Sequence, residues 1–178
     1  MKWAALPIAV IALGVTGCGT SDAGTGAAAA SVPASPRPKG TGPLTEKVVR
    51  TDLDTSTANA GVPANAPDFA RSAEERSDGS PASCAVALKG FGTETTRVDL
   101  SRLEGVVSEL RKRDWQQSRK REERKQADDI VEARVVLKQR GWTLTATYQD
   151  FAEKGVITLW AAEDACMKKI GADTDLLG

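Results

Sequence analysis

The clearest hydrophobic pattern in the chain is a stripe of apolar residues that recur at spacings of three and four. The stripe consists of Leu103, Val106, Val107 and Leu110. This spacing places all of them on one face of an α-helix. Ser101 and Glu104 stand where a capping box satisfies the first free amides of such a helix. An amphipathic helix is therefore predicted over residues 101–113.

Other segments have the character of strands. Residues 131–138 and 142–149 alternate apolar and polar side chains with a period of two, which is typical of a half-buried sheet, whereas 84–89 is a short apolar run. Strands are predicted at 84–89, 115–123, 131–138, 142–149 and 156–161. The segment 115–123 is polar and is predicted to be an edge strand, because charged side chains protect an edge from pairing with other chains. The aromatic residues of these strands are expected to anchor the core: Trp115, Trp142, Tyr148 and Trp160.

The segment 128–140 admits two interpretations. Its alternation favours a strand, which a type I turn over Lys138–Gly141 with glycine in the left-handed position would join to the next strand. A helix capped by Asp128 is the alternative, but it would carry Arg134 within its apolar stripe, so the hairpin is preferred. The predicted fold class is α+β, with one amphipathic helix on a mostly antiparallel sheet in the order β-α-β-β-β-β, within a domain of residues 84–178.

Residues 43–83 are predicted to pack on the outside of this domain. Leu44, Val48, Val49 and Leu53 suit one face of a short helix near 44–53. The following residues, 54–83, are rich in proline, glycine, serine and asparagine, and are predicted to be irregular.

The first 17 residues predict an export signal. Lys2 supplies a positive charge, and the uncharged run from Trp3 to Val15 is too short to span a bilayer, which needs about 20 apolar residues. A short charged start, an apolar run and then small residues are typical of a secretory signal peptide.

Val15-Thr16-Gly17-Cys18, which closes this run, resembles the lipobox of bacterial lipoproteins. The resemblance implies that a diacylglyceryl group is attached to the Cys18 thiol and that cleavage occurs before Cys18. It places the protein at the extracytoplasmic face of the cell membrane. Residues 18–42 lack any aromatic, leucine, isoleucine or methionine side chain, and are predicted to be a disordered linker. An ordinary signal peptide or an uncleaved anchor is the alternative.

The two remaining cysteines, Cys84 and Cys166, are expected to form a disulfide, because an even pair in an exported protein meets an oxidising environment. Two free thiols are the alternative. The alanine-rich linker, the single disulfide and the sequence Lys138-Gln139-Arg140-Gly141-Trp142 are similar to small uncharacterised lipoproteins of high-GC Gram-positive bacteria. This resemblance implies no activity, because it carries over no catalytic or ligand residues.

Composition argues against several classes of function. Lysine plus arginine and aspartate plus glutamate are balanced at 24 each, so that no net charge points to nucleic acid. The chain contains no histidine, the commonest general acid/base and metal ligand. No catalytic residue, cofactor or metal site is predicted. Adjacent acidic pairs, including Glu122-Glu123, Asp128-Asp129 and Glu163-Asp164, do not form a glycosidase site by themselves, because neighbouring residues on a strand point to opposite faces. A carboxylate-dependent hydrolase is kept as an alternative.

The highest density of charge lies between residues 111 and 125. Its basic members are Arg111, Lys112, Arg113, Arg119, Lys120, Arg121, Arg124 and Lys125. They are candidate contacts for anionic lipid headgroups or wall polymers. The alternative is a solvated helix end and edge strand, neutralised by Asp128, Asp129 and Glu132 just after it.

These features predict a membrane-anchored extracellular lipoprotein that is not an enzyme. The expected role is a binding or interaction module in the cell envelope, with an envelope protein or a wall polymer as its partner. The alternative function is a carboxylate-dependent hydrolase that acts on cell-wall glycans.

The anchor leads to a direct test. Cys18→Ala should move the full chain from the membrane fraction to the soluble fraction, because the thiol that carries the lipid is lost. Fractionation followed by immunoblotting measures the change, with Ser21→Ala as a control that leaves the cysteine intact. Retention of Cys18→Ala in the membrane at the level of the unaltered chain would contradict the lipobox interpretation.

Overall fold

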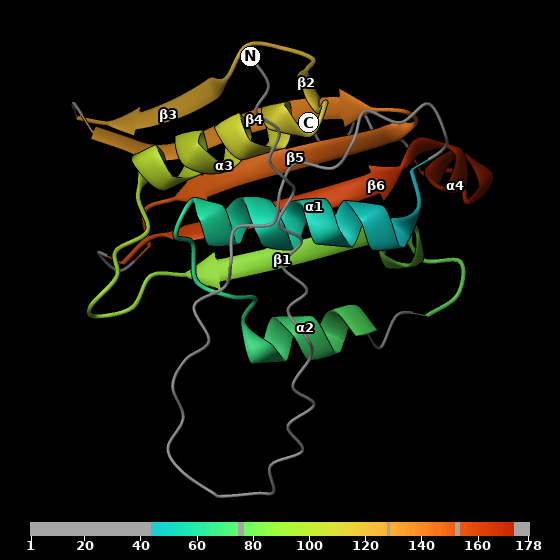
Figure 1. Cartoon of the computed structure of the whole chain (residues 1–178), viewed down its shortest axis with the longest axis horizontal. Helices are drawn as coiled ribbons and strands as arrows, with labels where there is room; N and C mark the ends of the chain where they lie inside the picture. The colour runs from blue at the N-terminus through green and yellow to red at the C-terminus, as the bar shows by residue number, and fades with distance from the viewer. Residues whose placement is uncertain (1–43, 75–76, 128, 152–153, 173–178) are drawn as a thin grey trace, which may run out of the picture. The chain divides into compact units, whose positions relative to one another are not determined.

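The computed structural model describes residues 44–74, 77–127, 129–151 and 154–172, so the predicted signal peptide (1–17), Cys18 and the linker (18–42) lie outside the described residues. The elements follow in the order α1 (Glu46–Asn59), α2 (Pro67–Glu74), η1 (Pro81–Cys84), β1 (Ala85–Phe91), α3 (Leu100–Lys112), β2 (Gln116–Gln117), β3 (Glu122–Gln126), β4 (Asp129–Gln139), β5 (Trp142–Gln149), β6 (Val156–Glu163) and α4 (Asp164–Lys169) (Figure 1).

All of these strands belong to one antiparallel sheet. Its order is β1-β6-β5-β4-β2, and β3 pairs with a different stretch of β4 along the same edge as β2. Helices α1 and α3 lie across one face of the sheet (Figure 1). The predicted α+β class, with an amphipathic helix packed on an antiparallel sheet, is confirmed.

The preferred hairpin is also confirmed, since residues 129–139 form strand β4 and not a helix. Gln139 pairs with Trp142, which leaves Arg140 and Gly141 as a two-residue turn. Both have positive φ, at 42° and 80°. This is the pattern of a type I′ turn, so the predicted type I turn is wrong. A type I′ turn fits because its twist matches that of the two strands it joins.

The predicted edge strand over 115–123 is wrong in its bounds. The chain forms two short strands instead, β2 and β3, which pair with successive parts of β4. Residues 118–121 lie between them. Every side chain of β3 is exposed, and its pairing with β4 is irregular between Arg124 and Lys125. Charge and irregular pairing both make an edge strand a poor template for another chain.

The helix predicted over 101–113 is α3, and its apolar stripe is buried as expected. Its cap is Asp99 and not the predicted Ser101. The Oδ1 atom of Asp99 accepts a hydrogen bond from the Ser101 hydroxyl at 2.6 Å and another from the Arg102 amide at 3.1 Å. The Ser101 hydrogen bond is the main cause that lowers the pKa of Asp99. The Asp99 carboxylate caps the helix in place of the capping box. Its negative charge also interacts favourably with the positive end of the helix dipole.

The N-terminal part of the described chain is more regular than predicted. Helix α1 continues to Asn59, beyond the expected end at residue 53, and its side chains Val49 and Leu53 are fully buried. Helix α2 lies within the segment 54–83 that was predicted to be irregular. Its first residue is Pro67, a position at which the missing amide has no partner to lose. Pro67 was expected to interrupt regular structure, but it is the first residue of a helix.

The main core fills the space between the two helices and the facing side of the sheet. Trp115 is fully buried, and its Nε1 donates to Asp52 Oδ2 at 3.0 Å. Trp142 Nε1 donates to the carbonyl of Leu44 at 3.1 Å. These two tryptophans and Tyr148 are core anchors, as predicted. Trp160 is only partly buried and packs on a second cluster.

That second cluster surrounds the disulfide on the other face of the sheet. Cys84 and Cys166 are bonded as predicted, with their Cα atoms 5.5 Å apart. Cys84 ends η1 and Cys166 lies in α4, so the bond joins two short helices and not the ends of two strands. In the chain-entropy model, closing a loop with a sequence separation of 82 stabilises the fold by roughly 4–5 kcal/mol.

The free edge of β1 is covered by the chain that precedes it. The Lys89 amide donates to Asn65 Oδ1 at 2.8 Å, and the Lys89 carbonyl accepts from the Ala66 amide at 2.9 Å. Arg50 donates to the carbonyl of Ala87 at 2.7 Å. Gly90 permits this approach, since a Cβ there would meet a Val62 methyl at 2.6 Å. Edge groups that could pair with another chain are thereby satisfied.

Two adjacent buried hydroxyls in α1 provide a matched test of these contacts. Thr57 Oγ1 donates to the carbonyl of Leu53 at 2.8 Å, whereas Ser56 Oγ is buried with no hydrogen-bond partner in the described part of the chain. Ser56→Ala should raise the free energy of unfolding by about 1 kcal/mol, because it removes an unsatisfied polar group. Thr57→Val should lower it by about 1 kcal/mol. Urea unfolding measures both, and a destabilised Ser56→Ala protein would show that the Ser56 hydroxyl has a partner in solution.

Candidate binding site

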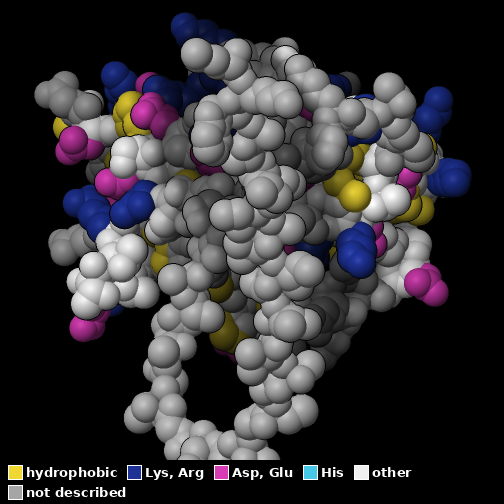
Figure 2. Space-filling model, in the orientation of Figure 1, with side chains coloured by type: hydrophobic (Ala, Val, Ile, Leu, Met, Phe, Trp, Pro, Cys, Tyr) yellow, Lys and Arg dark blue, Asp and Glu magenta, His cyan; other side chains and the backbone are white. Residues whose placement is uncertain are grey.

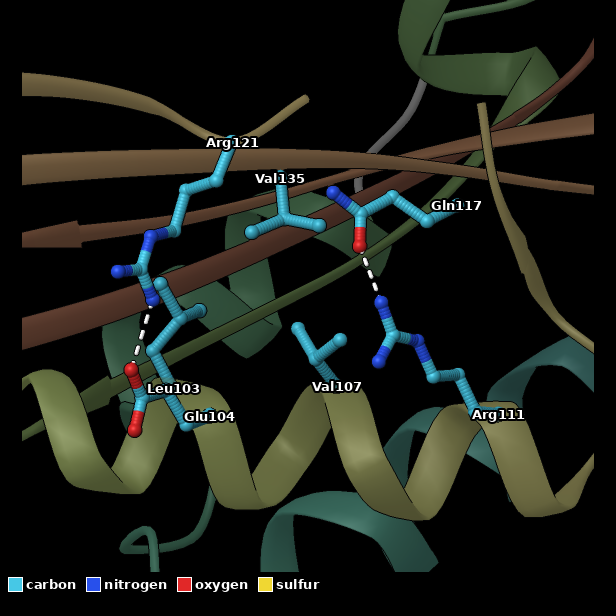
Figure 3. A pocket seen from close by; sticks show the side chains of 7 residues that line it. All are labelled: Leu103, Glu104, Val107, Arg111, Gln117, Arg121 and Val135. Carbon is cyan, nitrogen blue, oxygen red and sulfur yellow. Dashed lines mark hydrogen bonds and ion pairs between the residues drawn. The ribbon is translucent and has the colours of Figure 1, made fainter. Parts of the chain in front are cut away.

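A cleft of about 330 Å³ lies between α3 and the β2–β4 edge of the sheet (Figure 3). Its lining comprises Leu103, Glu104, Val107, Arg111, Gln117, Arg121 and Val135. The volume falls within the ~300–1,000 Å³ of ordinary ligand pockets. It is roughly twice the ~150 Å³ cavity that accommodates one benzene ring. Two of the eight basic residues predicted as surface contacts, Arg111 and Arg121, line this cleft at its opposite ends.

The helical period and the interrupted edge strand together form the cleft. Leu103, Val107 and Arg111 follow one another at intervals of four along α3, so they line one side in a row. Val135 projects from β4 on the face that packs against α3. Gln117 at the end of β2 and Arg121 just before β3 line the other side. The floor is aliphatic, with Leu103, Val107 and Val135 only 0%, 7% and 4% exposed.

At one end of the cleft, Arg111 is held by a neutral partner. Its guanidinium donates to Gln117 Oε1 (Figure 3). Gln117 Nε2 in turn donates to the carbonyl of Arg119 at 2.7 Å. The Gln117 amide is therefore fixed from both sides and positions the arginine. Among the described residues no carboxylate forms an ion pair with Arg111, so its charge is not neutralised there.

At the other end, Arg121 is held by two acidic side chains. It donates to Glu104 Oε1 on α3 at 2.7 Å (Figure 3). It also donates to Glu123 Oε1 on β3 at 2.7 Å. The hydrogen bond to Glu104 is the main cause that raises the pKa of Arg121. The Arg121 and Glu104 side chains are 32% and 56% exposed. An ion pair this exposed contributes about 0–1 kcal/mol, so this end of the cleft is closed only weakly.

The other basic residues predicted as surface contacts are dispersed. Arg113 is 3% exposed and donates to the Glu109 carbonyl at 3.0 Å, so its guanidinium lies in the interior and not on a surface. Arg119 pairs with Glu122 on β3, and Arg124 pairs with Glu132 on β4. Lys112 pairs with Glu109. Lys120 and Lys125 are exposed and have no ion pair within the described ranges.

The space-filling view agrees with this dispersal, since basic and acidic side chains alternate over the part of the face not drawn in grey (Figure 2). Another hollow, of about 510 Å³, lies beside the β4–β5 turn. It is lined by Asp114, Gln116, Lys138, Gln139, Arg140, Gly141, Trp142 and Asp164. Two acidic and two basic residues give this hollow no preference for a charged ligand.

The carboxylates proposed for hydrolysis are not gathered in the cleft. Glu123 binds Arg121, and Asp164 accepts a hydrogen bond from Thr143 at 2.8 Å, while Asp128 lies outside the described residues. Over the described ranges no group of three metal-ligating side chains occurs. No helix in the same ranges is long and apolar enough to cross a membrane.

Sequence patterns missed Glu104, Gln117 and Val135 as lining residues. The sequence pattern places Glu104 in a capping box, and Val135 is one of the alternating residues of a predicted strand. Gln117 carries no signal, because a glutamine in a polar strand is ordinary. Only the fold, which brings α3 against the interrupted edge, shows that they share a site.

Comparison of the chain with protein-family models, with curated proteins and with solved structures finds no match.

Glu109, which lies on α3 and accepts a hydrogen bond from Asn59 of α1, gives a test by pH. Hydrogen bonds from Lys112, and then from Asn59 and Arg113, lower its pKa below the ordinary value of 4.5. Because the folded pKa is the lower one, these contacts stabilise the protein above the unfolded pKa and are lost as the pH falls through the folded value. Glu109→Gln should therefore lower the free energy of unfolding by roughly 1 kcal/mol at pH 7, and the difference should vanish at low pH.

Denaturant unfolding between pH 2 and pH 7 measures this difference. Glu122→Gln is the matched control, since that exposed carboxylate lies 3.9 Å from Arg119 and should change stability little at any pH. A Glu109→Gln deficit that persists unchanged at pH 2 would show that the loss is not electrostatic.

Proposed function

We propose that this chain is a lipoprotein anchored through Cys18 at the extracytoplasmic face of the cell membrane, and that its folded part is a non-catalytic binding module of the envelope. The lipobox-like sequence Val15–Cys18 and the proline-containing linker support the anchor. The Cys84–Cys166 disulfide is consistent with export, because such bonds persist in oxidising compartments.

The observation that carries the binding role is the cleft beside α3. It combines an aliphatic floor with two positioned arginines, and ligand sites typically have this composition of apolar walls and few fixed polar groups. The cleft opens to the surface, since Arg111 and Glu104 at its rim are exposed. Its occupant is therefore proposed to be a component of the envelope.

The lining favours binding over hydrolysis. Glycoside hydrolysis needs two carboxyl groups about 5–10 Å apart across the cleft. The cleft contains one, Glu104, and this carboxylate is bound to Arg121. No serine, threonine or cysteine nucleophile contributes to its lining. The hydrolase stays the alternative function, and a site for it would have to lie elsewhere in the chain.

One experiment separates the two roles. The full chain is purified from membranes and its bound small molecules are extracted and identified by mass spectrometry, in parallel with Val107→Phe, which fills the floor of the cleft. A compound that accompanies the unaltered chain, is depleted at least tenfold from the variant and is recovered unchanged after incubation would support a binding module. A compound recovered as its hydrolysis product would support the enzyme, and equal recovery from both proteins would remove the cleft from the proposal.

A further inference from the structure

From the order of charges along β3 we infer that this strand pairs with β3 of a second copy of this chain. The two strands run antiparallel about a two-fold axis at Arg124, so that two sheets join into one. The pairing rests on the proposed anchor through Cys18, because tethering to one membrane raises the local concentration of the chains.

The outer side of β3 has no neighbouring strand in the described part of the chain. β3 pairs with β4 alone there, and it forms the rim of the sheet in Figure 1. Alternate residues of an edge strand direct their amide and carbonyl groups away from the sheet, where another strand can add. At the opposite edge, Arg50, Asn65 and Ala66 already bind such groups of β1. The edge at β3 is therefore the one that can accept a partner.

The irregular pairing beside β3 is caused by an extra residue in β4. Arg124 lies opposite Glu132 and Lys125 lies opposite Ile130, so Val131 has no partner in the ladder. A bulge of this kind puts the additional residue in one strand of the pair only. β3 keeps its regular alternation, and its side chains still point in turn to the two faces of the sheet.

The charges of β3 match those of a second β3 that runs in the opposite direction. Arg124 is the middle residue of the strand, so a two-fold axis at this residue pairs the full length of both copies. Glu123 of one copy then lies directly opposite Lys125 of the other, and this pair occurs twice. Both side chains lie on the same face, because residues two apart on a strand share a face. Directly opposed unlike charges stabilise a strand pair.

A shift of the axis by one residue opposes more like charges. An axis at Glu123 would place this carboxylate against its own copy and would oppose Arg121 to Lys125 twice. The favourable pairs in that register, Glu122 with Arg124, would be fewer. An axis at Lys125 would oppose this lysine to its own copy and use only part of the strand. Charge therefore selects the register at Arg124.

The selected register opposes one like pair, Arg124 and its copy. Each guanidinium has Glu132 of its own chain at 3.0 Å as a counterion. The Arg124 side chain is 67% exposed, so it can turn toward water. Glu122 of the other copy is a diagonal neighbour of Arg124, at a distance that long side chains reach.

Both members of the favourable pair are available to a partner. Lys125 is exposed and has no ion pair within the described ranges. Glu123 is bound by Arg121, but both contacts use Oε1, and the carboxylate has a second acceptor oxygen. Charges on an edge exclude a strand of different sequence, because they would lie opposite groups that do not match them. A second copy of β3 is the exception, since its charges run in the complementary order.

The proposed interface is small, which makes the anchor necessary. Two strands of five residues bury well under the ~1,200 Å² of total surface that stable complexes need. Free chains at low concentration are therefore expected to be monomeric. Chains tethered to one membrane meet at effective concentrations that reach the order of mM, at which weak contacts form.

Cysteine cross-linking of the full chain in isolated membranes tests the pairing. Opposed Cα atoms of an antiparallel pair are about 4.5–5.5 Å apart, within the range of a disulfide. On oxidation with a copper catalyst, Arg124→Cys should give a dimer of the chain at least fivefold more than Lys120→Cys, an exposed control outside β3. Equal yields, or a product that contains a different protein, would overturn the inference.

Charge exchange in the Arg124→Cys chain tests the register. Glu123→Lys should lower the dimer yield at least fivefold because it opposes cations, and Lys125→Glu should do the same because it opposes carboxylates. Chains that carry one substitution each, expressed together with tags of different mass, should recover the yield as a heterodimer, since unlike charges are then opposed. This recovery also shows that both variants fold. No loss from either substitution, or no recovery in the mixture, would contradict the register.

Release of the chain tests the need for tethering. Once Cys18→Ala moves the protein to the soluble fraction, Arg124→Cys should give at least fivefold less dimer at the same total amount of protein. Equal yield from the soluble chain would contradict the role of the anchor in pairing.

The pairing and the proposed function can fail separately. Chains that require Cys18 for membrane attachment and give no dimer with Arg124→Cys would keep the anchor and lose the pairing. A dimer linked at residue 124, together with a Cys18→Ala chain that remains in the membrane, would keep the pairing and lose the proposed anchor.

Discussion

The hydrogen bond between Trp115 and Asp52 fixes the relation of the helices to the sheet. Trp115 follows the end of α3 and precedes β2, and Asp52 lies in the middle of α1. Both side chains are buried, at 0% and 2% exposure. A carboxylate and an indole removed from water need partners, so α1 cannot slide along α3 without a large cost. The position of β2, and hence one side of the cleft, depends on this contact.

The two edges of the sheet are covered in different ways. At β1 the chain itself satisfies the outer groups through Arg50, Asn65 and Ala66. At β4 the edge is shared by two short strands with residues 118–121 between them. The interruption leaves space beside α3 that a continuous strand would have filled. The cleft thus arises where the edge strand is incomplete, and the same interruption brings Gln117 and Arg121 to its opposite ends.

Sequence patterns predicted the elements whose side chains repeat with a clear period. The stripe of α3 and the alternation in β4 to β6 gave the fold class, and the even cysteine pair gave the disulfide. They failed at helix starts, where several residue types are compatible with more than one position. Pro67 starts a helix instead of breaking one, and Asp99 is the cap that was predicted at Ser101. Of the site, the pattern of charge included Arg111 and Arg121. It could not distinguish these two from the buried Arg113, because the burial of an arginine depends on tertiary packing, which the periodicity of the sequence does not show.

The hydrogen bond from Trp142 to the Leu44 carbonyl has a mechanical consequence. Leu44 is the first described residue and is 6% exposed, so it enters the fold already held by the interior. Trp142 begins β5, which has β4 on one side and β6 on the other. Tension on the chain ahead of Leu44 is therefore transmitted to a central strand and shared by both neighbours.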